Sequence, residues 1–186
     1  LYLVANDGTL RCCSWDGGDE RWERSLGAAG GPPIFVSDGM VFFSTVRNDV
    51  VGCRASDGTV RWRCSLAGVS QAGVAVDENG VYVAAADGTV TALERATGER
   101  RWERTVGVGV VAAPVADGEA VFVTTCDGTL RRLDATTGCE RWTSESSTRV
   151  ARPTVAGGDG GDDIVVTGDK TGNIHTLDRE SGALLW

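Results

Sequence analysis

The sequence predicts an all-β protein, a β-propeller built of four-stranded antiparallel blades, and three observations support this fold class. First, five tryptophans recur at intervals of 40, 40, 40 and 44 residues, at Trp22, Trp62, Trp102, Trp142 and Trp186. Second, the residues before each tryptophan align column by column, as in VYVAAADGTVTALERATGERRW and VFVTTCDGTLRRLDATTGCERW. Third, no segment has the apolar periodicity of a helix. A period near 40 residues with several short strands in each copy is typical of propeller blades.

Each aligned copy reads as a strand, a turn, a strand, a turn and a strand. The opening strand is β-branched and aromatic, as in the VYV of residues 81–83, and this composition favours a strand. A DGT turn follows, in which a glycine such as Gly88 can adopt a positive φ without a Cβ clash. A second turn carries a glycine four residues before each tryptophan, and these are Gly18, Gly58, Gly98, Gly138 and Gly182. Asp134 and Asp178 precede this turn and are expected to bond its backbone amides.

The segments between copies supply a fourth, innermost strand. They read PPIFVSDG, GVAVDENG, APVADGEA and RPTVAGG, and they offer the propeller axis almost no acidic or amide side chains. The copies divide one propeller segment, residues 1–186, at approximately 1–26, 27–66, 67–106, 107–146 and 147–186. Three strands in the first copy and four in each of the others give an expected total of 19.

The segment Ala92–Trp102, ALERATGERRW, resembles the tryptophan-docking motif A-x-D-x-x-T-G-x-x-x-W of the PQQ-like β-propeller repeat family, named after pyrroloquinoline quinone. Arg132–Trp142 and Thr176–Trp186 match the motif nearly as well. The resemblance implies that each tryptophan packs against the neighbouring blade. The first two copies, CCSWDGGDERW and GCRASDGTVRW, lack the turn aspartate and the Thr-Gly pair, so their docking is expected to be weaker.

The same resemblance sets expectations for the parent molecule. Rings of this family usually have seven or eight blades, which implies that the five copies are part of such a ring and that its remaining blades are partners of this segment. Members of the family resemble either the lipoprotein that helps to assemble outer-membrane proteins or quinoprotein dehydrogenases. The first of these favours a periplasmic or cell-envelope location.

Charge and hydropathy exclude two classes of partner. The formal net charge is −8 and the pI is about 4.7, which disfavours nucleic acid because its phosphates repel an acidic surface. No apolar run reaches the roughly 20 residues that span a bilayer, so no direct membrane insertion is expected.

The pair Cys12–Cys13 is the first candidate for enzyme chemistry. Quinoprotein alcohol dehydrogenases carry a disulfide between adjacent cysteines over the PQQ ring. In this alignment, however, Cys13 shares a column with Cys53 and Leu93, and Cys12 shares one with small residues, as expected for core positions. All six cysteines are therefore predicted to be free thiols, and no cofactor is expected.

An acidic insertion is the second candidate. Gly157–Val165 fits the calcium nonapeptide G-G-x-G-x-D-x-U-x, in which Asp159, Asp162 and Asp163 are candidate calcium ligands. Such repeats hold calcium between successive turns, and a single copy lacks the second layer of ligands. A solvated loop is the preferred interpretation, with calcium as the alternative.

The remaining polar residues are interpreted structurally. His175 has no partner at a catalytic spacing and is assigned a packing role between blades. Arginines precede four of the tryptophans and are assigned to ion pairs on an exposed edge: Arg21, Arg61, Arg101 and Arg141.

The sequence therefore predicts a non-catalytic scaffold that binds a protein or peptide, with no catalytic, cofactor or metal residue. Two alternatives are a segment of a PQQ-dependent quinoprotein alcohol dehydrogenase and a ligand-sensing propeller of a kinase or membrane-anchored protein.

Overall fold

A computed structural model describes the chain except for residues 69–72, 111, 146–150 and 158–162. The described residues form 18 strands in five antiparallel sheets, and they contain no helix. The predicted all-β class and the blade repeat are therefore confirmed. In that part of the chain, no helix is long and apolar enough to cross a membrane.

Five blades follow one another along the chain. Blade 1 holds β1 (Tyr2–Val4), β2 (Thr9–Cys13) and β3 (Glu20–Ser25). Blade 2 holds β4 (Gly30–Ser37), β5 (Met40–Thr45), β6 (Asp49–Arg54) and β7 (Val60–Ser65). Blade 3 holds β8 (Val74–Val76), β9 (Val81–Ala84), β10 (Thr89–Leu93) and β11 (Arg100–Thr105). Blade 4 holds β12 (Val115–Asp117), β13 (Ala120–Thr124), β14 (Thr129–Asp134) and β15 (Glu140–Glu145). Blade 5 holds β16 (Thr154–Ala156), β17 (Ile164–Gly168) and β18 (Ile174–Asp178).

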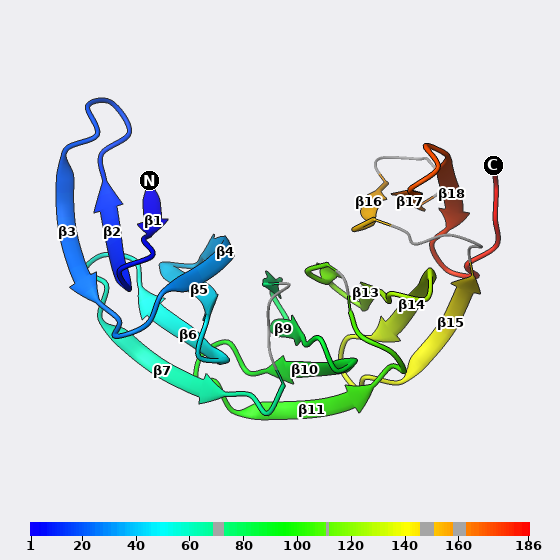
Figure 1. The fold of residues 1–186 in the computed structure, drawn as a ribbon, viewed down its shortest axis with the longest axis horizontal. Coiled ribbons are helices and arrows are strands. Elements are labelled where there is room, and N and C mark those ends of the chain that lie inside the picture. The colour runs from blue at the N-terminus through cyan, green and yellow to red at the C-terminus, as the bar shows by residue number, and fades with distance from the viewer. Residues whose placement is uncertain (69–72, 111, 146–150, 158–162) are drawn as a thin grey trace.

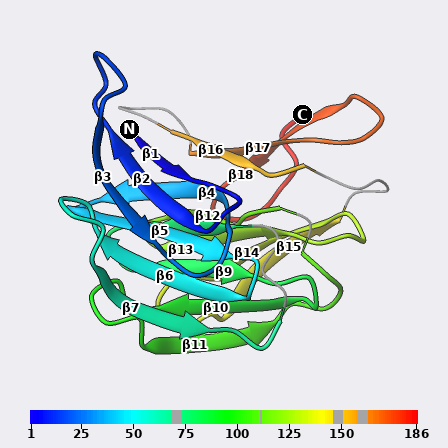
Figure 2. The same cartoon turned by 60° about the vertical axis from the view of Figure 1, so that its left-hand side comes forward.

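The blades form an open arc (Figure 1). Within each blade, strands consecutive in sequence pair side by side. The outermost strands β3, β7, β11 and β15 run along the outside of the arc, and blades 1 and 5 stand at its two ends (Figure 1). Turning the arc shows the sheets of blades 2 to 4 stacked together and the long β2–β3 hairpin projecting from blade 1 (Figure 2).

Blade 5 differs from the expectation of four strands. The described residues contain three strands in this sheet, and Leu184 meets Leu177 only through an isolated bridge. The amide of Thr176 donates to the carbonyl of Trp186, and the amide of Leu185 donates to the carbonyl of Thr176, both at 2.7 Å. These bonds extend over too few residues to make a strand ladder. The expected total of 19 strands is therefore wrong by one.

The hydrophobic core lies in the seams between blades rather than inside any one blade. Each of its four clusters combines apolar side chains from two adjacent blades. In the seam between blades 3 and 4, for example, Tyr82, Ala92 and Trp102 pack with Val121 and Leu133. Because both faces of a central blade are covered, strands such as β13 are buried at every position.

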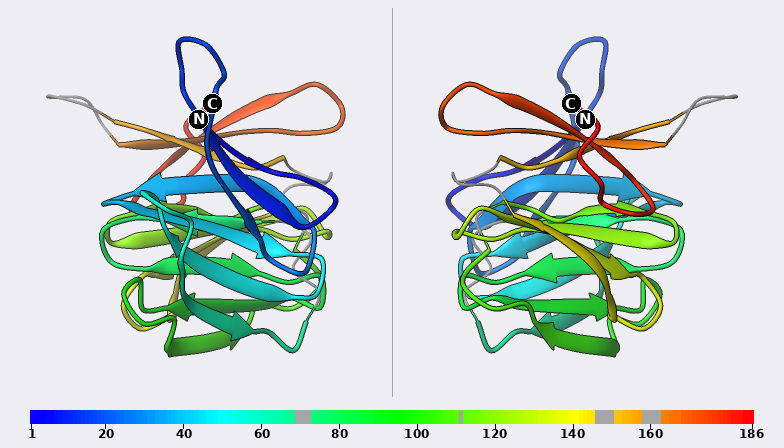
Figure 3. Two further views of the ribbon diagram at one scale, coloured as in Figure 1. Left: turned by 90° about the vertical axis from the view of Figure 1, so that its left-hand side faces the viewer. Right: turned by 90° about the vertical axis from the view of Figure 1, so that its right-hand side faces the viewer.

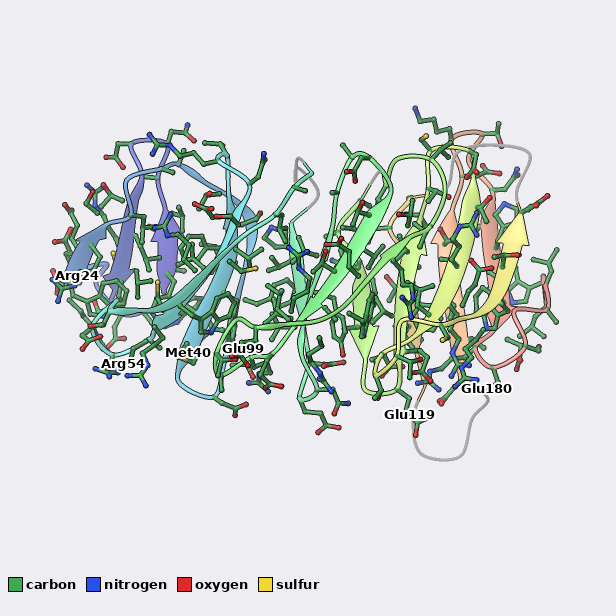
Figure 4. The ribbon with its side chains drawn as sticks, turned by 90° about the horizontal axis from the view of Figure 1, so that it is seen from below. Arg24, Met40, Arg54, Glu99, Glu119 and Glu180 are labelled. Carbon is green, nitrogen blue, oxygen red and sulfur yellow. The ribbon has the colours of Figure 1, made fainter. Side chains whose placement is uncertain are left out.

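Turns gather on two opposite faces of the arc (Figure 3). One face carries the turns that contain Gly58, Gly98, Gly138 and Gly182, together with the β4–β5, β8–β9 and β12–β13 turns, and is called the docking-turn face. Met40, Arg54, Glu99, Glu119 and Glu180 lie along this edge of the arc (Figure 4).

Candidate functional site

The first four motif tryptophans reach across the seam into the following blade. A bulge shifts the register of each strand pair just before the tryptophan, as between Ala92 and Leu93 opposite Trp102, and so redirects the side chain. Each indole Nε1 then donates a hydrogen bond to a backbone carbonyl of the next blade. The acceptors are Ala55 for Trp22 at 3.2 Å, Arg95 for Trp62 at 2.8 Å, Ala135 for Trp102 at 2.9 Å and Arg179 for Trp142 at 3.0 Å.

The turn that receives the indole depends on glycine. Gly138 has φ +69°, and a Cβ built there would lie 2.6 Å from Cε3 of Trp102. A side chain at this position would therefore meet both backbone strain and the ring itself. Gly58, Gly98 and Gly182 receive Trp22, Trp62 and Trp142 in the same way.

The turn carboxylate fixes this receiving loop. Asp134 Oδ1 accepts hydrogen bonds from the backbone amides of Thr136 at 3.1 Å and Thr137 at 2.8 Å, and Oδ2 accepts one from Arg141 at 2.6 Å. The Arg141 guanidinium and the hydrogen bonds from Thr137 lower the pKa of Asp134 to about 2. Asp178 accepts a bond from the amide of Ser181 at 2.7 Å, so both aspartates bond turn amides.

The expected weakness of copies one and two needs correction. Trp62 is 7% exposed and makes the shortest of the four indole bonds, so the second copy docks as closely as the third. The reason is that a tryptophan is received by the turn of the following copy. The irregular turn of copy two, residues 54–59, therefore receives Trp22, whose hydrogen bond is the longest.

Trp186 and Gly18 occupy docking columns of the repeat, but among the described residues neither packs against another blade. Trp186 is 70% exposed, and a Cβ on Gly18 would meet no atom within 4 Å. Trp15, at the position equivalent to Ala55 in the receiving turn, is 85% exposed. The arc therefore presents an empty receiving turn on blade 1 and an undocked tryptophan on blade 5.

A two-blade alternation runs through the seams, and single-copy alignment did not reveal it. The second residue of the opening strand is Tyr2, Phe42, Tyr82 and Phe122 in blades 1 to 4. In the blade that follows a tyrosine-containing blade, the indole is accepted by the carbonyl of an alanine, Ala55 or Ala135. In the blade that follows a phenylalanine-containing blade, it is accepted by the carbonyl of an arginine, Arg95 or Arg179. Comparing residues 80 apart, rather than 40 apart, would have exposed this pattern.

Arg95 and Arg179 also form side-chain ion pairs across the seams in which their backbone carbonyls accept the indole bonds. Arg95 Nη2 donates to Asp38 of blade 2 at 2.5 Å, and its guanidinium lies 5.9 Å from the centroid of the Phe42 ring. Arg179 Nε donates to Asp117 of blade 4 at 2.8 Å. At the first seam a tyrosine takes part instead, because Tyr2 Oη donates to the carbonyl of Ala55 at 3.1 Å.

The cysteines lie in three environments. Cys12 and Cys53 are buried, and burial raises the pKa of the Cys53 thiol to about 12. Cys13 is half-buried, whereas the alignment had placed it in the same fully apolar column as Cys53. Cys126 and Cys139 are exposed, and all six are free thiols.

The remaining candidate residues, which are the calcium-loop aspartates, His175 and the arginines before the tryptophans, do not form one site. Asp159 and Asp162 of the calcium candidate lie outside the described residues, whereas Asp163 Oδ2 lies 3.9 Å from Nη1 of Arg179. His175 is half-buried, and its Nε2 lies 3.1 Å from Oδ2 of Asp169 in the β17–β18 turn, so the ring contacts that turn in addition to its expected packing position. Arg141 pairs with Asp134 at 2.6 Å, as expected for an ion-paired edge, and Arg101 donates to the carbonyl of Asn79.

The side chains near the axis do not fit a PQQ–calcium group. Such a group needs carboxylate and amide ligands that converge on one ion. The innermost strands β4, β8, β12 and β16 carry a single acid, Asp117, which is already paired with Arg179. Within the described ranges, no three His, Cys, Asp or Glu side chains are placed to hold one metal ion.

Pockets open at the seams on the docking-turn face. One of about 490 Å³ lies between blades 4 and 5 and is lined in part by Asp117, Arg152 and Arg179. Another of about 480 Å³ runs from Asn79 past Arg132 to Glu180. A third of about 310 Å³ lies between blades 2 and 3 and is lined by Asp38, Met40, Phe42, Glu78, Glu94, Arg95 and Ala96.

The chain is similar to known proteins in both sequence and structure. A family model described as outer membrane protein assembly factor BamB matches residues 1–68 and 47–186. A search of curated proteins finds no match. BamB from Moraxella catarrhalis is similar in structure, with a TM-score of 0.74 and 19% identity over 100% of this chain and 71% of that chain.

Two further solved structures are similar. The computationally designed Ika8 protein gives a TM-score of 0.82 at 22% identity, over 100% of this chain and 57% of that chain. A europium-containing methanol dehydrogenase gives 0.82 at 13% identity, over 100% of this chain and 48% of that chain. At these identities the likeness shows the fold alone, and the chain spans about half the length of these two proteins.

Proposed function

The chain belongs to the PQQ-like β-propeller repeat family whose model is described as outer membrane protein assembly factor BamB, and on that premise we propose that it is a non-catalytic scaffold. The scaffold binds a protein or peptide partner on its docking-turn face. Propeller folds serve both enzymes and binding proteins, so the proposal depends on the side chains rather than on the fold.

The observation that carries the proposal is how the polar side chains are used. The turn carboxylates Asp134 and Asp178 bond backbone amides, and Arg95 and Arg179 bond acids across seams. These groups are committed to holding turns and blades in place. A catalytic site would instead bring titratable groups together around a reacting atom, and the described residues contain no such cluster of metal-binding type.

One experiment separates the scaffold from the quinoprotein alternative. Purified chain is titrated with PQQ and calcium while the quinone absorbance and dye reduction with primary alcohols are followed. We expect neither saturable binding nor turnover. Saturable binding at micromolar PQQ, with turnover that a calcium chelator abolishes, would overturn the proposal.

A positive test of the scaffold uses a displayed library of linear peptides selected against the purified chain. We expect a peptide class whose binding protects amides of the docking-turn face from hydrogen exchange. Protection confined to the opposite face would contradict the proposed surface.

Further propeller blades are proposed as partners at the two ends of the arc. The support is the undocked Trp186 and the empty receiving turn at Gly18, since every other motif tryptophan meets a glycine of the next blade. We expect Trp186→Ala to leave the thermal stability of this chain unchanged and to lower that of a protein carrying the additional blades. An equal loss in both would contradict this pairing.

A further inference from the structure

The pocket between blades 2 and 3 has an apolar floor. Phe42 is fully buried beneath the guanidinium of Arg95, and Met40, half-buried, lies at the edge of the docking-turn face (Figure 4). Met40 is the single methionine of the chain, and its unbranched side chain can adapt to an apolar group placed against it. The pocket of about 310 Å³ is therefore suited to the aliphatic part of a side chain.

The rim of the pocket is acidic. Asp38, Glu78 and Glu94 face a single cation, Arg95, which is already engaged with Asp38. Within the residues that the structure describes, the carboxylates of Glu78 and Glu94 have no hydrogen-bond or ion-pair partner. The rim therefore carries negative charge that no described side chain neutralises.

Glu94 shows how the motif makes this charge available. It occupies the column of Asp134 and Asp178, whose carboxylates bond the amides of their own turns. Glutamate is one methylene longer, and among the described residues its carboxylate makes no bond to the turn amides, although the hydroxyl of Thr97 bonds the amide of Glu99 at 3.2 Å just as Thr137 bonds Cys139 in blade 4. The carboxylate of Glu94 is thus released from the turn and lines the seam pocket.

The same seam already holds one guanidinium against an aromatic face and a carboxylate, in Arg95, Phe42 and Asp38. Among the described residues, the three acids do not form a group able to hold one metal ion. We propose that this pocket binds a linear segment of a protein partner in which Lys or Arg lies next to an apolar residue. This inference rests on the proposed scaffold function, and it names the partner's chemistry.

The test uses a fluorescent peptide of alternating lysine and leucine, and a second in which glutamate replaces every lysine. Binding to the purified chain is followed by fluorescence anisotropy. The double variant Glu78→Gln/Glu94→Gln removes two charges from the pocket. The matched control Glu99→Gln/Glu119→Gln removes two charges from the same face outside the pocket (Figure 4).

We expect the basic peptide to bind, with an affinity reduced about tenfold by the pocket variant and less than about twofold by the control. Raising the ionic strength from about 0.1 M to about 1 M should abolish most of the binding. Met40→Ala should weaken binding while leaving the dependence on salt unchanged, because it removes apolar contact only.

Three results would overturn the assignment. Equal loss in the pocket and control variants would mean diffuse attraction to the whole face. If the acidic peptide bound as tightly as the basic one and Glu78→Gln/Glu94→Gln had no effect, the scaffold function would still hold, but the pocket would not be the binding site. Failure of the basic peptide, of the acidic peptide and of every displayed library peptide to bind would remove both proposals.

Discussion

The indole nitrogen of Trp102 donates a hydrogen bond to the backbone carbonyl of Ala135, 33 residues further along the chain and in the next blade. The same separation joins Trp22 to Ala55 and Trp62 to Arg95, whereas it is 37 residues for Trp142, where blade 5 carries an insertion. Because the acceptor is main chain, the contact persists whether that residue is alanine or arginine. The constant spacing of the repeat therefore places each indole donor opposite a main-chain acceptor, and the resulting hydrogen bonds join adjacent blades.

Replacing Trp102 with alanine should lower the free energy of unfolding by about 3–5 kcal/mol, as for other deletions of large buried side chains. The indole is 7% exposed and fills the seam between blades 3 and 4. Denaturant unfolding measures the change. Trp15→Ala is the control, since that side chain is 85% exposed and its loss should cost less than about 0.5 kcal/mol. Equal losses for the two variants would contradict the seam assignment.

Gly138→Ala should also destabilise the protein, by at least about 1 kcal/mol, because alanine is strained at φ +69° and its Cβ would overlap the Trp102 ring. Part of this cost depends on the ring. In the background of Trp102→Ala the same substitution should therefore cost less, and a double-mutant cycle measures the difference. Strict additivity of the two changes would show that the ring and the turn do not interact.

Much of the fold could be predicted because the repeat records it directly. The tryptophan spacing, the paired turns and the β-branched strands each predict one strand or turn, and the observed sheets follow them. The motif implied that Trp102 packs against the neighbouring blade, whereas its contact with Gly138 is known only from the structure. The fourth strand of blade 5 was expected from the alignment alone. An alignment cannot show that the last residues make only a few backbone hydrogen bonds to Thr176 and no continuous ladder.

The acidic seam pocket could not be predicted from the same alignment. Arg95 and Asp38 lie 57 residues apart, so their pairing depends on how two blades stack. Glu94 lies in the same alignment column as Asp134, and the column alone does not distinguish the two acids. One methylene decides whether the carboxylate bonds its own turn or faces the seam, and only the structure shows which.

The cysteines should react in an order set by burial. Cys126 and Cys139 are exposed, and a hydrogen bond with Thr137 lowers the pKa of the Cys139 thiol, so both should react rapidly in the native protein. Cys53 should react only on unfolding, because it is buried and its pKa is about 12. Thiol titration before and after denaturation checks this order, with six thiols expected in total. Removal of the rapid phase by Cys126→Ser/Cys139→Ser is the control, and rapid labelling of Cys53 would refute it.

Asp134→Asn should destabilise the protein at neutral pH. The carboxylate is held ionised by Arg141 and by turn amides, and its pKa falls from 3.8 to about 2. A depressed pKa in the folded state means that this stabilisation is present above about 3.8 and is lost as the pH falls towards 2. Stability measured between pH 7 and pH 2 should show the variant and the original protein converging at the acid end. A constant difference across this range would exclude the ion pair as the cause.

Asp77→Asn should have the opposite sign. Asp77 Oδ1 accepts bonds from the amides of Asn79 at 2.8 Å and Gly80 at 3.0 Å, whereas Oδ2 is buried without a partner among the described residues. Burial therefore raises the pKa of this carboxyl, and ionising it in the folded state costs free energy. A raised folded-state pKa means that stability contributed by this group is complete below the ordinary value of 3.8 and falls as the pH rises through the raised pKa.

Asparagine at position 77 keeps the oxygen that holds the turn and removes the buried charge. We expect Asp77→Asn to stabilise the protein at pH 7 by up to about 1 kcal/mol, after allowance for partial exposure, with the gain shrinking towards pH 3. Denaturant unfolding at the two pH values measures the change, alongside Asp134→Asn as the oppositely signed reference. A loss of stability at pH 7 would show that the charged form of Asp77 is the one that the seam requires.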